Sequence, residues 1–108
     1  YATLAEGYGA SVITIDSFDE TLELVRTGRA DATLNDNATF YYYNKVQPEN
    51  DFKVAALTEN ASRVAVPMRK GEETKTLQEA VNKAISELIE SGELAQISEK
   101  YFGTDLTK

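Results

Sequence analysis

The stretch DSFDETLELVRTGRADATLNDN, residues 16–37, reads as a helix, a turn and a strand in direct succession. Ser17 is a good N-cap residue, and Glu20 three positions later completes a capping-box pattern. The apolar positions at helical spacing are Phe18, Leu22 and Val25. Gly28 stands where a helix commonly ends with a left-handed residue. The pattern therefore predicts a helix that begins after Ser17 and ends before Gly28.

A short strand is predicted immediately after this helix, at residues 30–34. Ala30, Ala32 and Leu34 alternate with polar residues, which is the period of a strand with one buried face. The apolar character stops at Asn35, and a helix-like run with three tyrosines follows from residue 37. Asp36 therefore lies between the end of a predicted strand and the start of a predicted helix.

The rest of the chain continues the alternation of strands and helices. Further helices are expected at residues 1–8, 37–46, 73–90 and 93–101, and further strands at residues 11–15, 52–57 and 62–68. Strands that alternate with helices over short loops imply crossover connections. The expected fold class is α/β, with a mostly parallel sheet covered by helices.

Composition narrows the classes of function. The 108 residues carry a net charge of −7, which disfavours nucleic acid as a partner because that binding depends on basic surface. The chain has no Cys and no His, so thiol catalysis, His-based acid–base catalysis and the usual zinc sites are not expected. We expect no catalytic residue, no metal site and no cofactor. No apolar run approaches the roughly 20 residues of a membrane span.

Asp36 is the main candidate for a functional residue, and two interpretations of it remain open. An Asp before a helix commonly accepts hydrogen bonds from the first-turn N–H groups. Alternatively, ligands of open α/β sheets bind outside the carboxyl ends of the strands, where a carboxylate suits an ammonium group. The two roles are compatible, because one oxygen can cap the helix while the other faces a ligand.

The aromatic run FYYY, residues 40–43, also allows two interpretations. It could form a stacking platform for a ligand. A helix cannot bury three consecutive side chains on one face, however, so a division between core and surface is the stronger interpretation.

Two blocks of the sequence resemble the amino-acid-binding proteins of ABC importers, in the polar-amino-acid and cystine-binding branch. The first block is TIDSFDETLELVRTGRADATLNDNATFYY, residues 14–42. The second is VAVPMRKGEETKTLQEAVNKAISELIESGELAQISEKYFG, residues 64–103, which is similar to the C-terminal signature of that family. The resemblance implies a two-lobed clamp, of the type 2 periplasmic-binding-protein fold, that closes on a free amino acid.

The resemblance also implies a division of the chain and a binding site. Residues 1–65 correspond to lobe 2 without its first strand, and residues 66–108 to the hinge crossing and the C-terminal helices of lobe 1. Asp36 stands at the family position that binds the α-ammonium of the ligand, and Asn35 and Asn37 lie near the pocket. The chain begins at Tyr1 without an initiator Met or a signal-peptide pattern, so we expect a piece of a longer protein.

The implied function is solute binding for uptake, without enzymatic chemistry. The implied partners are a polar amino acid, with cystine as one candidate, and a membrane permease. Either the missing N-terminal lobe or a second copy by exchange would cover the apolar face of the helix at 73–90. The location would be extracytoplasmic, in the periplasm or as a lipoprotein at the outer face of the membrane. The alternatives are a sensor domain of a receptor and, with less support, a cleft enzyme such as a dehydratase.

Overall fold

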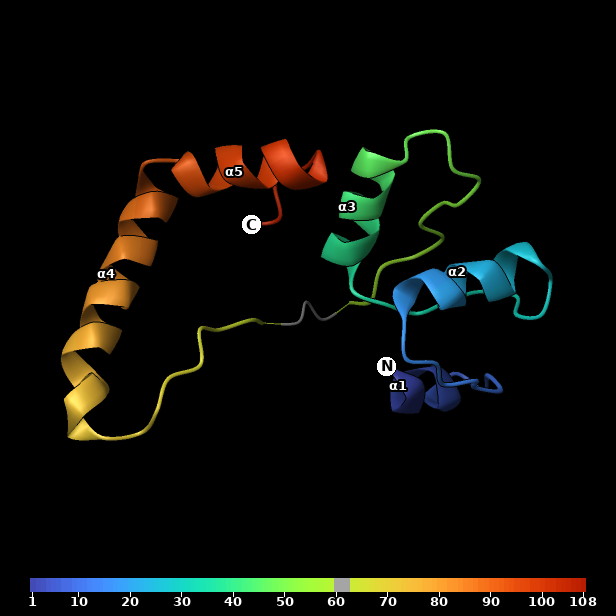
Figure 1. The fold of residues 1–108 in the computed structure, drawn as a ribbon, viewed down its shortest axis with the longest axis horizontal. Coiled ribbons are helices and arrows are strands. Elements are labelled where there is room, and N and C mark those ends of the chain that lie inside the picture. Colours follow the sequence, from blue (N-terminus) through green and yellow to red (C-terminus); the bar gives the residue numbers. More distant parts are fainter. Residues whose placement is uncertain (60–62) are drawn as a thin grey trace. The chain divides into compact units, whose positions relative to one another are not determined.

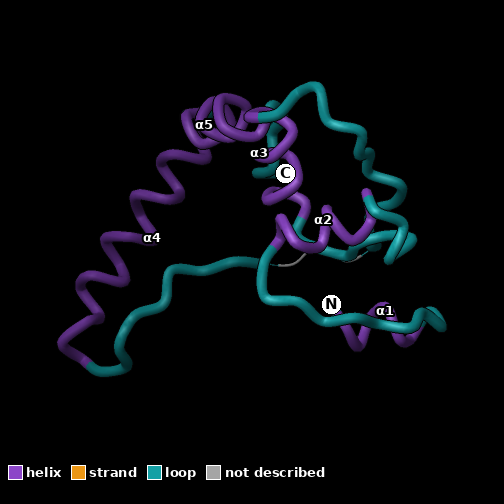
Figure 2. Tube along the Cα trace, turned by 45° about the vertical axis from the view of Figure 1, so that its right-hand side comes forward, coloured by secondary structure: helices purple, strands orange, loops and turns teal. Residues whose placement is uncertain are grey.

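The computed structural model describes residues 1–59 and 63–108, and in these residues it consists of helices joined by loops (Figures 1 and 2). The elements are α1 (Ala2–Gly7), α2 (Phe18–Arg26), α3 (Asn37–Val46), the 3-10 helix η1 (Glu72–Thr74), α4 (Lys75–Glu90) and α5 (Glu93–Phe102). The chain divides into two units, Tyr1–Phe40 and Tyr41–Lys108. All of the helices expected from the sequence are therefore confirmed, with bounds that differ by one or two residues.

Helix α2 in the first unit begins and ends as its sequence predicts. The Ser17 hydroxyl oxygen accepts a hydrogen bond from the Glu20 N–H at 3.2 Å. Gly28 has a φ of 70°, in the left-handed region that favours glycine. The Gly28 N–H donates to the Val25 carbonyl at 3.1 Å and the Arg29 N–H to the Leu24 carbonyl at 2.9 Å. These two bonds are a Schellman motif, which satisfies carbonyl groups that the helix leaves free.

The parallel sheet expected from the sequence is not formed in residues 1–59 and 63–108. The segments 11–15, 30–34, 52–57 and 63–68 are loops, and Ser62, where the last expected strand begins, lies outside the described residues. A helix forms its backbone hydrogen bonds within one segment, whereas a strand needs a neighbouring strand. None of these segments is paired with another in the described part, so strand-like composition alone leaves them as loops.

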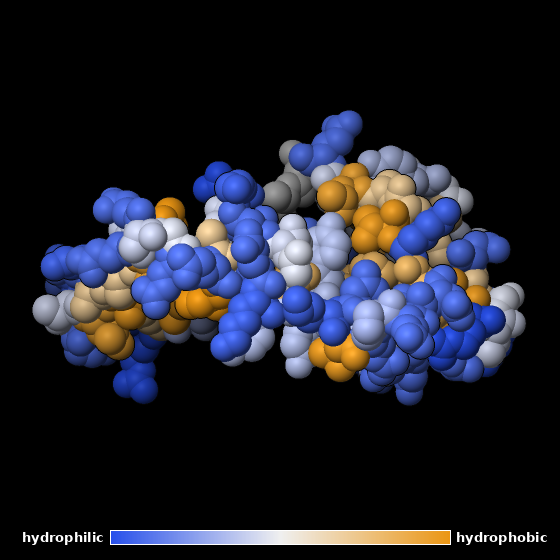
Figure 3. Space-filling view, turned by 90° about the horizontal axis from the view of Figure 1, so that it is seen from above, coloured by the Kyte–Doolittle hydropathy of each residue, from blue (hydrophilic) through white to orange (hydrophobic). Residues whose placement is uncertain are grey.

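Few hydrophobic side chains are covered. In the described part of the chain, Leu22 on α2 is the one hydrophobic residue that is buried, with 3% of its surface exposed. Hydrophobic side chains lie at the surface among hydrophilic ones (Figure 3). The exposed ones on α4 are Leu77, Ile85 and Ile89. These apolar residues of α4 are therefore uncovered in the structure.

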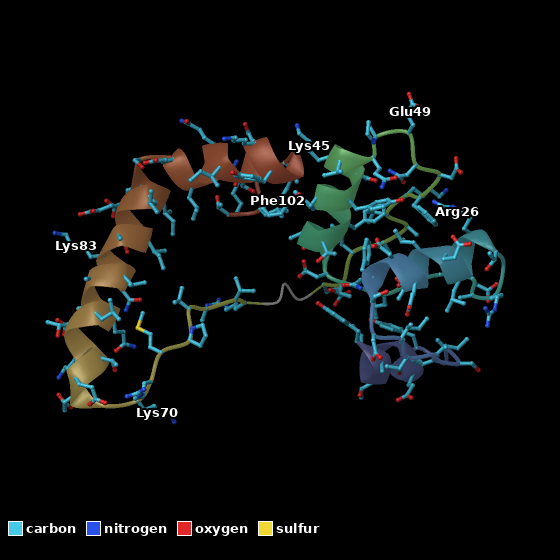
Figure 4. The ribbon with its side chains drawn as sticks, in the orientation of Figure 1. Arg26, Lys45, Glu49, Lys70, Lys83 and Phe102 are labelled. Carbon is cyan, nitrogen blue, oxygen red and sulfur yellow. The ribbon has the colours of Figure 1, made fainter. Side chains whose placement is uncertain are left out.

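Helices α4 and α5 contact each other in the second unit and are separated by the short turn at Ser91 and Gly92. Lys83 extends from α4 away from the loop that carries Lys70 (Figure 4), and its Nζ lies 3.7 Å from Oε1 of Glu87. The charged residues thus occupy the side of α4 opposite to the apolar one. This amphipathic pattern indicates a helix made to pack on one face.

Candidate functional site

Asp36 lies at the start of α3, at the end of the loop that follows the Schellman turn of α2. Its Oδ1 accepts a hydrogen bond from the Thr39 N–H at 3.1 Å. Its carbonyl oxygen accepts from the Phe40 N–H at 3.4 Å, which begins the helix. The helix-capping interpretation of Asp36 is therefore confirmed. Its side chain is half-buried, which leaves part of the carboxylate accessible.

The two asparagines beside Asp36 differ in what they do. The Asn35 Oδ1 accepts a hydrogen bond from the backbone N–H of Asp36 at 2.7 Å. The Asn37 side chain makes no hydrogen bond within the described residues, and both asparagines are exposed. The Asn35 side chain is thus hydrogen-bonded to the backbone of Asp36, whereas the Asn37 side chain is available to solvent.

The two oxygens of the Asp36 carboxylate differ in their contacts. Within the part of the chain that the structure describes, no hydrogen bond or ion pair reaches Oδ2. An ionised carboxylate oxygen forms strong, short hydrogen bonds with cationic donors such as ammonium. The arrangement can therefore hold a helix start and accept a cationic group at the same time.

The tyrosines of α3 do not form one surface. Tyr42 exposes 52% of its surface, whereas Tyr41 and Tyr43 are half-buried. The ring of Tyr43 packs edge-on against Phe52, with 6.3 Å between the ring centroids. This division between packing and exposure agrees with the interpretation that the three side chains are not a stacking platform.

A hollow of about 530 Å³ lies in the second unit, between the 64–71 loop and the first half of α4. Its apolar wall includes Val66, Val81 and Ile85, and its polar rim includes Arg69 and Lys70. None of the residues predicted to bind a ligand lines it. The hollow is an uncovered part of the apolar face of α4.

The chain after α5 is fixed by a buried serine that sequence reasoning did not single out. Ser98 exposes 5% of its surface, donates to the Thr104 carbonyl at 2.8 Å and accepts from the Leu106 N–H at 2.8 Å. Gly103, with a φ of 74°, ends the helix and turns the chain back toward Ser98. The only sequence signal was Gly103, because the partners of a serine hydroxyl cannot be read from its spacing.

The carboxylate of Asp105 forms a second local network in this tail. Its Oδ1 accepts from the Thr107 hydroxyl at 2.6 Å and from the Thr107 N–H at 2.9 Å, and Oδ2 lies 3.1 Å from Nζ of Lys108. These donors, the Thr107 hydroxyl first among them, lower the pKa of Asp105 to about 2. The network joins residues at most three apart, so it is a feature of the tail and not a ligand site.

Metal clusters and membrane spans are absent from the described residues. Within residues 1–59 and 63–108, no three side chains of the metal-binding types gather closely enough to hold an ion. Over the same residues, no helix has the length and apolar content to cross a membrane.

Comparison with protein families then shows to which family the chain belongs. Residues 4–104 match the model for bacterial extracellular solute-binding proteins, family 3. The chain belongs to this family. The resemblance seen in the sequence is thereby confirmed, and Asp36, the α2 turn and the α4–α5 block all lie within the matched residues of this solute-binding family.

Three curated relatives align with nearly all of the chain. The L-cystine-binding protein TcyA of Bacillus subtilis is 33% identical over 108 residues, which are 100% of this chain and 40% of the relative. A probable amino-acid ABC transporter-binding protein of Haemophilus influenzae is 33% identical over 104 residues, or 96% and 40% of the two chains. The L-cystine-binding protein TcyJ of Escherichia coli is 39% identical over 102 residues, or 93% and 36%.

The chain thus spans about 40% of the length of the curated relatives that it matches. No solved structure matched it. The family and these relatives are named as binding proteins and not as enzymes.

Proposed function

We propose that the chain is part of an extracytoplasmic solute-binding protein that binds a free polar amino acid, with L-cystine as the first candidate, and delivers it to an ABC permease. The observation that carries the proposal is the family match over residues 4–104, together with relatives that are named for L-cystine and amino-acid binding. We also propose a location in the periplasm, or at the outer face of the membrane through a lipid anchor, which the match to extracellular solute-binding proteins supports.

Asp36 supplies the chemistry of the proposed site. Its Oδ1 is held by the Thr39 N–H, and Oδ2 has no partner in the described part of the chain. An α-ammonium group would donate to Oδ2 in a charge-assisted hydrogen bond, which is about twice as strong as a neutral one. We assign no catalytic step to this chain, because recognition and delivery need complementary charge and lobe closure only.

The proposed function includes a division of the chain between two lobes. We propose that residues 1–65 belong to lobe 2, and that residues 66–108 cross the hinge and contribute helices to lobe 1. The uncovered apolar residues of α4, Leu77, Ile85 and Ile89, support a packing partner outside these residues. In the full-length protein the strand-like loops would pair in a parallel sheet, with the remaining chain supplying their neighbours.

A thermal-shift panel on the full-length protein tests the ligand class. L-cystine, other polar amino acids and dibasic amino acids would be compared at concentrations from micromolar to millimolar. A ligand at 100 times its Kd adds about 2.7 kcal/mol to the free energy of unfolding. We expect a clear rise in Tm for at least one amino acid, and the absence of any rise across the panel would contradict the proposed function.

The role of Asp36 is tested by Asp36→Asn in the same protein. Asn is as good an N-cap as Asp, so the start of α3 is kept while the negative charge is lost. We expect the affinity for the amino acid to fall about 10- to 100-fold, since hydrogen bonds to charged groups are among the strongest. Isothermal titration calorimetry measures the change, and an unchanged Kd would remove Asp36 from the site.

A further inference from the structure

Asp36 is held by one hydrogen bond at its side chain and by another at its backbone, and neither bond involves its free oxygen. The Thr39 N–H donates to Oδ1 at 3.1 Å, and the Asn35 Oδ1 accepts from the Asp36 N–H at 2.7 Å. The first bond restrains one oxygen of the carboxylate, and the second restrains the backbone that carries the side chain. Asp36 is therefore positioned before any ligand is present.

This positioning has two consequences for a ligand. A side chain that is already ordered loses less conformational entropy on binding, so more of the interaction energy appears as affinity. With Oδ1 engaged, the carboxylate offers one oxygen. A primary ammonium needs only one, whereas a guanidinium binds best to both oxygens and would have to break the helix cap.

We infer that Asn35 is a positioning residue for the ammonium site: it acts on ligand binding through Asp36 and does not contact the ligand. The inference rests on the proposed function, because it requires that Asp36 bind an ammonium group. The Asn35 amide oxygen, which is the group of this side chain that could accept from an ammonium, is already bonded to the Asp36 N–H.

The test uses the full-length protein, with L-cystine as the probe and 3,3′-dithiodipropionate as its analogue without ammonium groups. Asn35→Ala removes the acceptor for the Asp36 N–H. Thr33→Ala is the matched control, because Thr33 is an exposed residue of the same loop and makes no hydrogen bond in the described residues. We expect Asn35→Ala to weaken L-cystine binding about three- to tenfold, the size of one neutral hydrogen bond, and the control to leave it unchanged.

Two readouts distinguish positioning from direct contact or general destabilisation. In an Asp36→Ala background, Asn35→Ala should have no further effect on L-cystine binding, since coupled residues are not additive. The binding of dithiodipropionate should be the same with and without Asn35. A loss that persists in the Asp36→Ala background, or that extends to dithiodipropionate, would overturn the inference.

A second variant covers the case in which Asn35→Ala does not fold. Asn35→Asp keeps an acceptor oxygen for the Asp36 N–H, so its affinity for L-cystine should be at least that of the native protein. Weaker binding by Asn35→Asp would contradict the positioning role. If the native protein binds L-cystine but neither variant changes the affinity, the inference alone fails. If the native protein binds no amino acid, the proposed function fails and the inference fails with it.

Discussion

Helix α2 and the loop at residues 30–34 are adjacent in the chain but differ in where their hydrogen bonds can come from. Helix α2 has its own i to i+4 bonds, the Ser17 cap and the Schellman bonds at Gly28, all within residues 17–29. The loop has an alternating apolar pattern but no partner segment beside it in the described residues. A segment whose stabilising bonds are local can therefore form alone, whereas a strand depends on chain elsewhere.

The largest expected effect is a difference in hydrogen exchange between this chain and the full-length protein proposed above. In the 108-residue chain, we expect the amide protons of residues 31–34 and 53–57 to exchange at nearly unprotected rates. In the full-length protein they should be protected at least about 10³-fold, because sheet amides open only through costly unfolding. Hydrogen exchange followed by mass spectrometry measures both forms. Equal exchange in the two forms would show that these loops are not strands in either.

The same distinction explains how much of the molecule could be predicted. The bounds of α2 followed from Ser17 and Gly28, the end of α5 followed from Gly103, and the helix cap at Asp36 followed from its place before α3. The absence of a sheet could not be predicted in this way, because the strand propensity of residues 30–34 does not indicate whether a neighbouring strand is available to pair with them. The ligand-binding role of Asp36 stays a prediction, since a carboxylate oxygen without a partner in the described residues does not identify a ligand.

The tail after α5 is another segment that is held by local bonds, because one buried side chain, Ser98, fixes it although it has no regular structure. Ser98→Ala leaves the Thr104 carbonyl and the Leu106 N–H without their partner. We expect the free energy that holds the tail against α5 to fall by about 1 to 3 kcal/mol, which is the usual penalty for buried groups left unsatisfied. Faster exchange of the Leu106 amide would report it. Ser91→Ala, in the exposed turn before α5, is the control and should leave that amide unchanged.

Alanine substitutions at Gly28, which ends α2, and at Gly7, another glycine of the same unit, should have opposite effects. Gly28→Ala places a side chain at a φ of 70°, which costs about 1 to 2 kcal/mol for an L-residue. Gly7 in α1 has no positive φ and has open space where the Cβ atom of an alanine would lie, so Gly7→Ala should instead stabilise its helix by about 0.5 to 1 kcal/mol. Backbone chemical shifts of α1 and α2 measure the two effects, and changes of the same sign would contradict this account.

The smallest effect expected is a dependence of the tail on pH, through Asp105. Because its pKa is lowered from 3.8 to about 2 by the Thr107 and Lys108 donors, its contribution to order is complete above pH 3.8. That contribution is lost as the pH falls through the folded pKa, so the tail should loosen between about pH 4 and pH 2. The amide resonance of Thr107 should follow this titration. Thr107→Val removes the hydroxyl donor and keeps the N–H, so it should raise the midpoint without abolishing it. A midpoint that stays the same in Thr107→Val would show that the hydroxyl is not the main cause of the lowered pKa.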